Sequence, residues 1–152
     1  MKQAAFALML LLAAACASSK AQNGKPARPD VAIDVEQVVG PAQLNYPYGP
    51  MEVQYEFLIQ NRSAQPITLT RIEVSTLNTA GGPYLLRRDF YNVNKTIPAN
   101  GADTVKLWAK AFGFGRGMRE NEPITLRVIA YFQSPSGTFQ KIFMRELSQY
   151  PD

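Results

Sequence analysis

The chain contains no histidine and only one cysteine, Cys16, among its 152 residues. Histidine is the commonest general base and the commonest metal ligand in proteins, so its absence removes the usual starting point for both kinds of site. A lone thiol without histidine also excludes Cys–His nucleophiles and the Cys/His sets that hold zinc. Because a second cysteine is missing, no disulfide can form within the chain. We therefore expect no metal site and no cofactor site.

The acidic residues do not replace what histidine would supply. The carboxylates considered as catalytic acids or bases are Asp89, Asp103, Glu120 and Glu122. Their spacing pairs no two of them in a known catalytic pattern. We predict that the protein is not an enzyme, and an enzyme that uses carboxylates and lysine remains the third of three functional alternatives.

An apolar run long enough to cross a bilayer is also missing. The longest run, Ala4 to Ala15, has twelve residues, whereas a membrane-spanning helix needs roughly 20. The run follows a positive charge at Lys2 and ends in small residues, which is the arrangement of an export signal. We predict that residues 1–15 are a signal peptide.

The sequence Ala13-Ala14-Ala15-Cys16 at the end of this run resembles the lipobox of bacterial lipoproteins. The resemblance implies that Cys16 is lipidated and becomes the first residue of a mature protein held on a membrane by its acyl chains. Ala17 is not the aspartate that retains some lipoproteins in the inner membrane, so the resemblance further implies the outer membrane, facing the periplasm. The alternative is ordinary signal peptidase cleavage, which leaves Cys16 as a free thiol or removes it.

The segment after the cysteine contains no large apolar residue from Ala17 to Pro29. Such a composition cannot bury enough surface to offset its ordering entropy, so we predict that residues 16–30 are the lipidated cysteine and a flexible tether. Residues 31–152 then form one domain, which is long enough to build a core without disulfides.

Helical periodicity is missing from this domain, and period-two alternation of apolar and polar residues takes its place. Seven stretches read as strands: Val31–Val39, Met51–Gln60, Ile67–Leu77, Tyr84–Val93, Thr104–Phe112, Pro123–Phe132 and Thr138–Leu147. The apolar phase changes within Ile67–Leu77, which predicts a β-bulge or a strand that changes sheet. The pattern predicts an all-β protein with a single antiparallel immunoglobulin-like sandwich of about seven strands.

Two segments carry a resemblance to a known kind of domain. FLIQNRSAQPITL ends a strand in Asn61 and small polar residues, and IPANGADTVKL introduces a later strand through a Pro/Asn/Gly turn. Together they resemble immunoglobulin-like domains of bacterial envelope proteins. The resemblance implies a fold type, and it supports the sandwich predicted from the alternation.

Three places could bind a partner. The first is the glycine-rich loop after Phe112, whose candidate residues are Phe114, Arg116, Met118 and Arg119; its alternative role is simply to connect two strands. The second is the stretch with Arg87 and Arg88, of which at most one can face a given partner if they lie on one strand, and which could equally protect a sheet edge. The third is the pair Tyr46 and Tyr48, able to stack on sugar rings or to pack under their loop.

The chain has a formal charge of +4, with 16 Lys and Arg against 12 Asp and Glu. This mild bias favours anionic surfaces without specifying one, and the export signal argues against nucleic acid as a partner. We predict a non-enzymatic, membrane-anchored envelope lipoprotein, held through lipid on Cys16, whose sandwich binds or scaffolds an envelope protein or polysaccharide. The alternative is a soluble periplasmic or secreted carbohydrate-binding domain that uses Tyr46, Tyr48 or Phe114.

Overall fold

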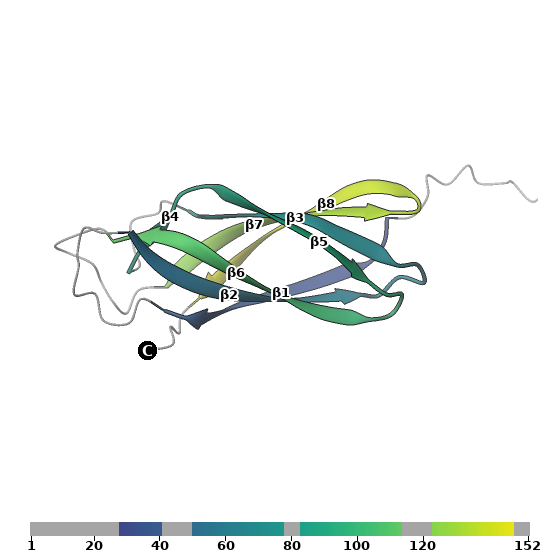
Figure 1. Ribbon diagram of the computed structural model, residues 1–152, viewed down its shortest axis with the longest axis horizontal. Coiled ribbons are helices and arrows are strands. Elements are labelled where there is room, and N and C mark those ends of the chain that lie inside the picture. Colours follow the sequence, from purple (N-terminus) through teal and green to yellow (C-terminus); the bar gives the residue numbers. More distant parts are fainter. Residues whose placement is uncertain (1–27, 41–49, 78–82, 114–122, 148–152) are drawn as a thin grey trace, which may run out of the picture.

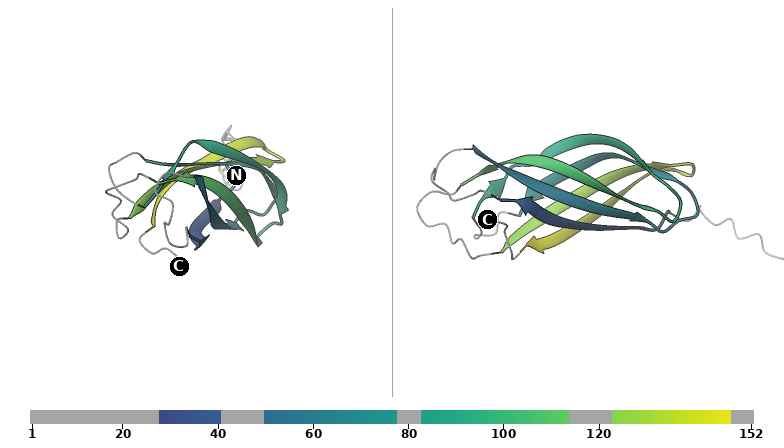
Figure 2. Two further views of the ribbon diagram at one scale, coloured as in Figure 1. Left: turned by 60° about the vertical axis from the view of Figure 1, so that its left-hand side comes forward. Right: turned by 60° about the horizontal axis from the view of Figure 1, so that its bottom comes forward.

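The computed structural model describes residues 28–40, 50–77, 83–113 and 123–147, which form two antiparallel sheets (Figure 1). Each sheet has four strands, in the orders β1-β2-β6-β4 and β5-β3-β7-β8. The strands are β1 (Val31–Val39), β2 (Pro50–Asn61), β3 (Ile67–Thr76), β4 (Leu85–Leu86), β5 (Asp89–Ile97), β6 (Ala102–Phe112), β7 (Ile124–Ser134) and β8 (Gly137–Leu147). Figure 2 shows the two sheets as two packed layers.

The predicted all-β antiparallel sandwich is confirmed, with eight strands among the described residues. The first sheet follows the A-B-E-D order of immunoglobulin domains, and the second places β3, β7 and β8 in the order C-F-G with β5 added beside β3. The strand in the D position is the short β4, which has two residues.

The core lies between the two sheets and is built from the alternating apolar residues of the inner strands. On β2, Val53, Tyr55, Phe57 and Ile59 have no exposed surface, and on β7 Leu126, Val128, Ala130 and Phe132 are buried opposite them. Each large side chain buried in this way stabilises the fold by roughly 1.5–3 kcal/mol relative to exposure. The polar residues that alternate with them therefore point outward, which leaves two outer faces available to partners.

The change of apolar phase within β3 has the predicted cause. The pairing of β3 with both neighbouring strands shifts between Leu69 and Arg71. The extra residue, Thr70, donates a hydrogen bond from Oγ1 to the carbonyl of Tyr131 at 3.0 Å. Because of this bulge, Leu69 and Ile72 both face the core although they are three residues apart.

The single strand predicted for residues 84–93 is wrong. Leu85–Leu86 pairs with β6 in the first sheet, whereas Asp89–Ile97 pairs with β3 in the second. The chain leaves the first sheet at Arg87 and Arg88, because two adjacent arginines on one strand would force one of them into the core. The second strand also continues past Val93 to the buried Ile97, so it includes Asn94, Lys95 and Thr96.

Lysine side chains tie the two sheets together along both of their long edges. On one side the Lys95 ammonium lies 2.7 Å from Asp103 and donates to the carbonyl of Thr104 at 3.0 Å. On the other side Lys141 donates to the carbonyl of Val31, and an Arg145–Asp34 ion pair at 3.2 Å lies beside it. Each edge of the sandwich is therefore closed by charge-assisted contacts between strands of different sheets.

Candidate binding surface

Many of the predicted site residues lie outside the described part of the chain. These are Cys16, the loop residues Phe114, Arg116, Met118 and Arg119, and the tyrosines Tyr46 and Tyr48. The structure does place the strands that flank the loop. Phe112 pairs with Pro50 at the first residue of β2, whereas Val31 pairs with Asn61 at its last. The loop is therefore attached at the end of the sandwich opposite to the one where the domain begins.

The two arginines of the second predicted site go to different surfaces. The Arg87 guanidinium lies 4.8 Å from the ring centroid of Phe112, at the end of β6. Arg88 instead reaches the outer surface of the second sheet and contacts Glu73. The expectation about a shared partner assumed that both arginines lie on one strand, whereas they lie between β4 and β5 and separate because the chain crosses between sheets there.

Glu73 is a carboxylate buried on the outside of a sheet. Alternation from the core residues Ile72 and Val74 points it outward, yet its residue surface is only 4% exposed. Arg88 covers it with two contacts, Nε to Oε1 at 2.6 Å and Nη2 to Oε2 at 3.2 Å. Arg127 approaches from β7 with Nη1 at 3.8 Å, and the Tyr131 hydroxyl donates to Oε2 at 3.4 Å. Two guanidinium groups therefore share one carboxylate.

This arrangement keeps Glu73 ionised. The hydrogen bond from Arg88 is the largest influence and lowers the pKa of Glu73 below its ordinary value, with help from the positive charges of Arg88 and Arg127 and from the Tyr131 hydroxyl. Burial acts in the opposite direction and is outweighed. The same contact raises the pKa of Arg88. The Glu73 carboxylate thus holds Arg88 in one orientation on the surface.

Arg71 extends the cationic surface along β3. Its guanidinium carbon lies 4.2 Å from the ring centroid of Tyr131 and 5.6 Å from that of Phe90. Stacking on aromatic rings fixes the planar group without neutralising it. Within the described residues Arg71 makes no ion pair, so its charge is available to a partner.

Apolar side chains surround these arginines on the same face. Phe90 on β5 is 59% exposed, and Ile142 and Met144 on β8 are 50% and 61% exposed. The register places Met144 opposite Arg127 and Ile142 opposite the buried Ile129. We call this surface of the second sheet the arginine face, defined by Arg71, Glu73, Arg88, Phe90, Arg127, Tyr131, Ile142 and Met144.

The outer surface of the first sheet has the opposite charge balance. Its carboxylates are Asp34, Glu36, Glu52 and Glu56, and its lysines are Lys106 and Lys110. Lys106 pairs with Glu56 at 3.0 Å within this surface, and Asp34 pairs with Arg145 of β8 at 3.2 Å. Arg87 lies on the Phe112 ring at the end of β6. Trp108 alternates with the buried Leu107 and Ala109, so it is on this surface, and it is 50% exposed. We call this surface the acidic face.

Sequence reasoning missed the arginine face as a unit. Alternation around the β3 bulge could have indicated that Arg71 and Glu73 share a surface with Arg127 and Tyr131. Nothing in the spacing indicates that Arg88 folds over Glu73, because that contact depends on where the chain crosses between sheets. Of the four carboxylates considered as catalytic, Glu120 and Glu122 lie outside the described residues. The other two are separate: Asp89 begins β5, and Asp103 is paired with Lys95 near the other end of that strand.

Two other polar groupings are structural. Tyr84, Tyr55 and Gln37 form a buried chain of hydrogen bonds inside the sandwich, in which Tyr84 donates to Gln37 Oε1. Gln37 Nε2 has no hydrogen-bond partner in the described part of the chain. Because Tyr84 gives its proton to Gln37, Tyr55 must donate to the Tyr84 oxygen. These groups fix the position of the segment that precedes β4.

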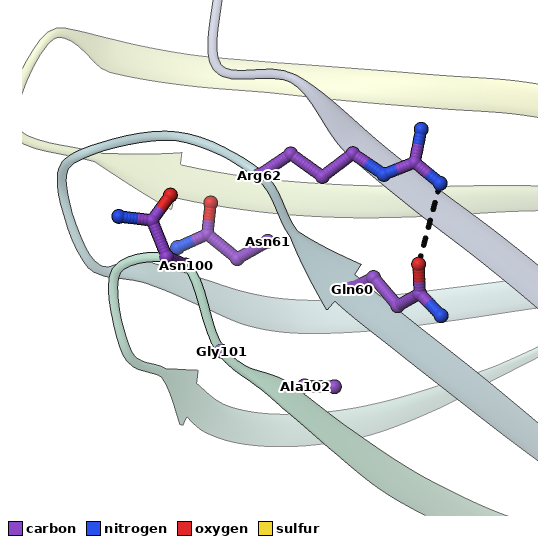
Figure 3. A pocket seen from close by; sticks show the side chains of 6 residues that line it. All are labelled: Gln60, Asn61, Arg62, Asn100, Gly101 and Ala102. Carbon is purple, nitrogen blue, oxygen red and sulfur yellow. Dashed lines mark hydrogen bonds between the residues drawn. The ribbon is translucent and has the colours of Figure 1, made fainter.

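The second grouping is a shallow pocket at the turns after β2 and β5 (Figure 3), lined by Gln60, Asn61, Arg62, Asn100, Gly101 and Ala102. The buried Asn61 amide donates to the carbonyls of Gln65 at 2.8 Å and Pro98 at 2.9 Å, and its oxygen accepts from the Ser63 hydroxyl at 2.7 Å. The side chain that would give this pocket specificity is therefore occupied in joining two turns. It holds the end of the sandwich together.

Neither metal chemistry nor a helical membrane anchor is found in the described ranges. No three side chains among the described Cys, Asp and Glu residues lie close enough to hold a metal ion. No helix there is long and apolar enough to span a membrane.

No protein-family model and no curated protein matches this chain. Among solved structures, the chain is similar to an X-ray structure of a target of the Northeast Structural Genomics Consortium, with a TM-score of 0.51 and 15% identity over 80% of this chain and 86% of that one. It is also similar to the solution structure of a protein described as late embryogenesis abundant, with a TM-score of 0.51 and 11% identity over 80% of this chain and 71% of that one. At such identities the likeness shows the fold alone.

Proposed function

We propose that this protein is a non-enzymatic bacterial lipoprotein, anchored through lipid on Cys16, whose sandwich binds another component of the cell envelope through the arginine face. The anchor is supported by the apolar run that ends in Ala13-Ala14-Ala15-Cys16. Its location is the cell envelope, on the outer membrane facing the periplasm. The absence of histidine from the chain supports a binding role over a catalytic one.

The proposed binding role rests on the arginine face. Its three guanidinium groups are held by Glu73 and by two aromatic rings, so little side-chain freedom is lost when a partner binds. Arginine and aromatic residues are enriched at the centres of binding surfaces. Exposed Phe90, Ile142 and Met144 add apolar contact area around the charges.

The anchor is tested by growing cells with a labelled fatty acid and isolating the protein. Label should enter the wild-type chain and be absent from Cys16→Ser. Equal label in both proteins, or none in either, contradicts the anchor.

The binding surface is tested with a photo-crosslinking amino acid placed at Phe90 on the arginine face. Leu58, which is 40% exposed on the acidic face, is the matched control position. We expect an adduct with an envelope molecule from position 90 and not from position 58. Adducts only from position 58, or from neither position, would contradict binding through the arginine face.

The second candidate function is a soluble periplasmic or secreted carbohydrate-binding domain. Half-exposed Trp108 favours it, because a flat exposed ring is the usual stacking platform for a sugar. Gln54 lies directly opposite Trp108 on β2 and could bond to sugar hydroxyls. Binding of the wild-type chain to envelope polysaccharide, lost in Trp108→Ala and retained in Arg71→Gln, would support this function over the first.

A further inference from the structure

The two outer faces of the sandwich differ in charge, and this difference gives the molecule an electrostatic orientation. The arginine face holds three arginines, with Glu73 beneath them and Glu146 opposite Thr125 at the end of the sheet. On the acidic face, four carboxylates stand against two lysines and Arg87, whose guanidinium lies on the ring of Phe112 at the end of β6. Near an anionic surface, a body with this distribution turns its cationic side toward that surface.

The apolar residues of the arginine face match the same environment. Phe90, Ile142 and Met144 are each at least half exposed and lie on the two outer strands of the sheet, β5 and β8. Between them, Arg71 and Arg127 come from the two inner strands, β3 and β7. A membrane-contacting surface combines arginines, which donate to phosphate oxygens, with apolar side chains that lie beside them at the level of the headgroups.

The length of chain before the domain allows this surface to reach a membrane. Ala17 to Pro29, the segment between Cys16 and the domain, could span at most about 45 Å when fully extended. A strand of 11 residues such as β8 is roughly 36 Å long. A sandwich attached at the Val31 end can therefore lie flat against the membrane that holds its anchor.

We propose that the arginine face binds anionic phospholipid headgroups, so that the sandwich lies with β5, β3, β7 and β8 against the membrane and the acidic face away from it. This inference rests on the proposed function for the location of the protein, and it identifies the partner of the arginine face. Each arginine near an anionic surface strengthens binding roughly five-fold. The free face therefore binds weakly, and attachment to the same membrane raises its effective concentration to about the millimolar range.

The composition of the chain offers a direct test, because Trp108 is its only tryptophan and lies on the acidic face. A chain starting at Ala17 retains every described element of the sandwich and lacks the lipidation site. When this chain binds vesicles of phosphatidylethanolamine and phosphatidylglycerol, the fluorescence emission of Trp108 should stay unchanged. Trp108 should also remain accessible to quenching by acrylamide. In the double variant Trp108→Phe/Phe90→Trp, the emission should shift to shorter wavelength and be quenched by brominated lipid. Quenching of Trp108 in place of position 90, or no binding to these vesicles, overturns the proposal.

Matched charge variants test whether vesicle binding depends on the arginine face or only on the net charge of the chain. Arg71→Gln and Lys110→Gln remove the same charge from opposite faces, and neither residue forms an ion pair among the described residues. We expect Arg71→Gln to bind the vesicles about five-fold more weakly and Lys110→Gln to bind within about two-fold of the parent chain. Equal weakening by both variants overturns the assignment to the arginine face. Thermal unfolding of each variant verifies that the sandwich is intact.

The remaining comparisons distinguish the partner and the anchor. Vesicles of phosphatidylcholine alone should bind the chain at least ten-fold more weakly, and added salt should release it from the anionic vesicles. Binding to an acidic polysaccharide but not to the vesicles overturns the lipid proposal. Because this chain has no Cys16, its binding is independent of the fatty-acid labelling result, so the anchor and the lipid-binding face can fail separately.

Discussion

The hydroxyl oxygens of Tyr55 and Tyr84 lie 2.5 Å apart inside the sandwich. Tyr55 belongs to β2, and Tyr84 lies in the segment that leads to β4, so this contact positions the start of the crossing between sheets. The same crossing delivers Arg88 to Glu73, and the buried tyrosines therefore contribute to the arginine face from the opposite side of the core.

Replacing Tyr84 by phenylalanine should destabilise the fold by about 1–3 kcal/mol, because Tyr55 loses this acceptor and Gln37 loses this donor in a buried environment. Urea unfolding measures the change in the free energy of unfolding. Tyr131→Phe is the control, since its hydroxyl makes a longer, partly exposed contact, and it should cost less than about 1 kcal/mol. An equal loss in both variants would mean that the buried contact carries no special weight.

Glu73→Gln should lower stability at neutral pH by about 1–3 kcal/mol, since Arg88 and Arg127 lose their shared carboxylate. The pKa of Glu73 is lowered in the folded state, so its contribution is present above the ordinary carboxyl pKa of 4.5. That contribution is lost as the pH falls through the lower native value. The difference in the free energy of unfolding between wild type and variant should therefore be constant above about pH 5.5 and shrink below about pH 4.5.

Unfolding free energies measured at a series of pH values give this comparison. Asp103 also has a lowered pKa because of Lys95, so the variant retains some acid dependence. A difference that stays the same down to the acid limit of the experiment would show that Glu73 is not held ionised by its arginines.

Asn61→Ala should cost on the order of 3 kcal/mol, because it removes one side chain that makes three hydrogen bonds and joins two turns. Chemical unfolding provides the measurement. Asn100→Gly is the matched control in the same pocket, since Asn100 has a φ of 52° that glycine adopts freely. We expect the control to change stability by less than about 0.5 kcal/mol; a similar cost in both would argue against a joining role for Asn61.

As the pH rises into the alkaline range, Tyr91→Phe should lose less stability than the wild type. Burial is the largest cause that raises the pKa of Tyr91 to about 12, and neighbouring Asp89 adds to it. A raised native pKa means that the stabilising contribution is present below the unfolded value of about 10 and is lost as the pH rises towards 12. The difference in tyrosinate absorbance between wild type and variant should therefore titrate near pH 12, and a titration near pH 10 would contradict this assignment.

The strands were largely predictable because alternation reports directly which residues face the core. Val53 to Ile59 on β2 and Leu126 to Phe132 on β7 follow the predicted pattern, and the β3 bulge was visible as a change of phase. The division of residues 84–93 was not predictable, since Tyr84 and Leu86 are in one phase and Tyr91 in the other, a change that a bulge within one strand could also explain. Whether this stretch forms one strand or two depends on the sheet to which each half pairs.

The arginine face was less predictable than the strands that carry it. Trp108 and Leu58 lie on an outer surface, in step with the alternation along β6 and β2, and both are exposed. Glu73 is also outward by alternation, but its burial results from Arg88 and Arg127, which approach from other segments of the chain. Surface clusters of this kind depend on long-range packing, and a single sequence contains no local signal for it.

Lys95 and Lys141 have a consequence for how this protein meets other copies of itself. The carbonyls of Thr104 and Val31, which they occupy, belong to β6 and β1, whose backbone is open to an incoming strand at these positions. A strand that added there would have to displace a bound ammonium group from the carbonyl. The two lysines thus make these strand edges less open to edge-to-edge pairing with another copy.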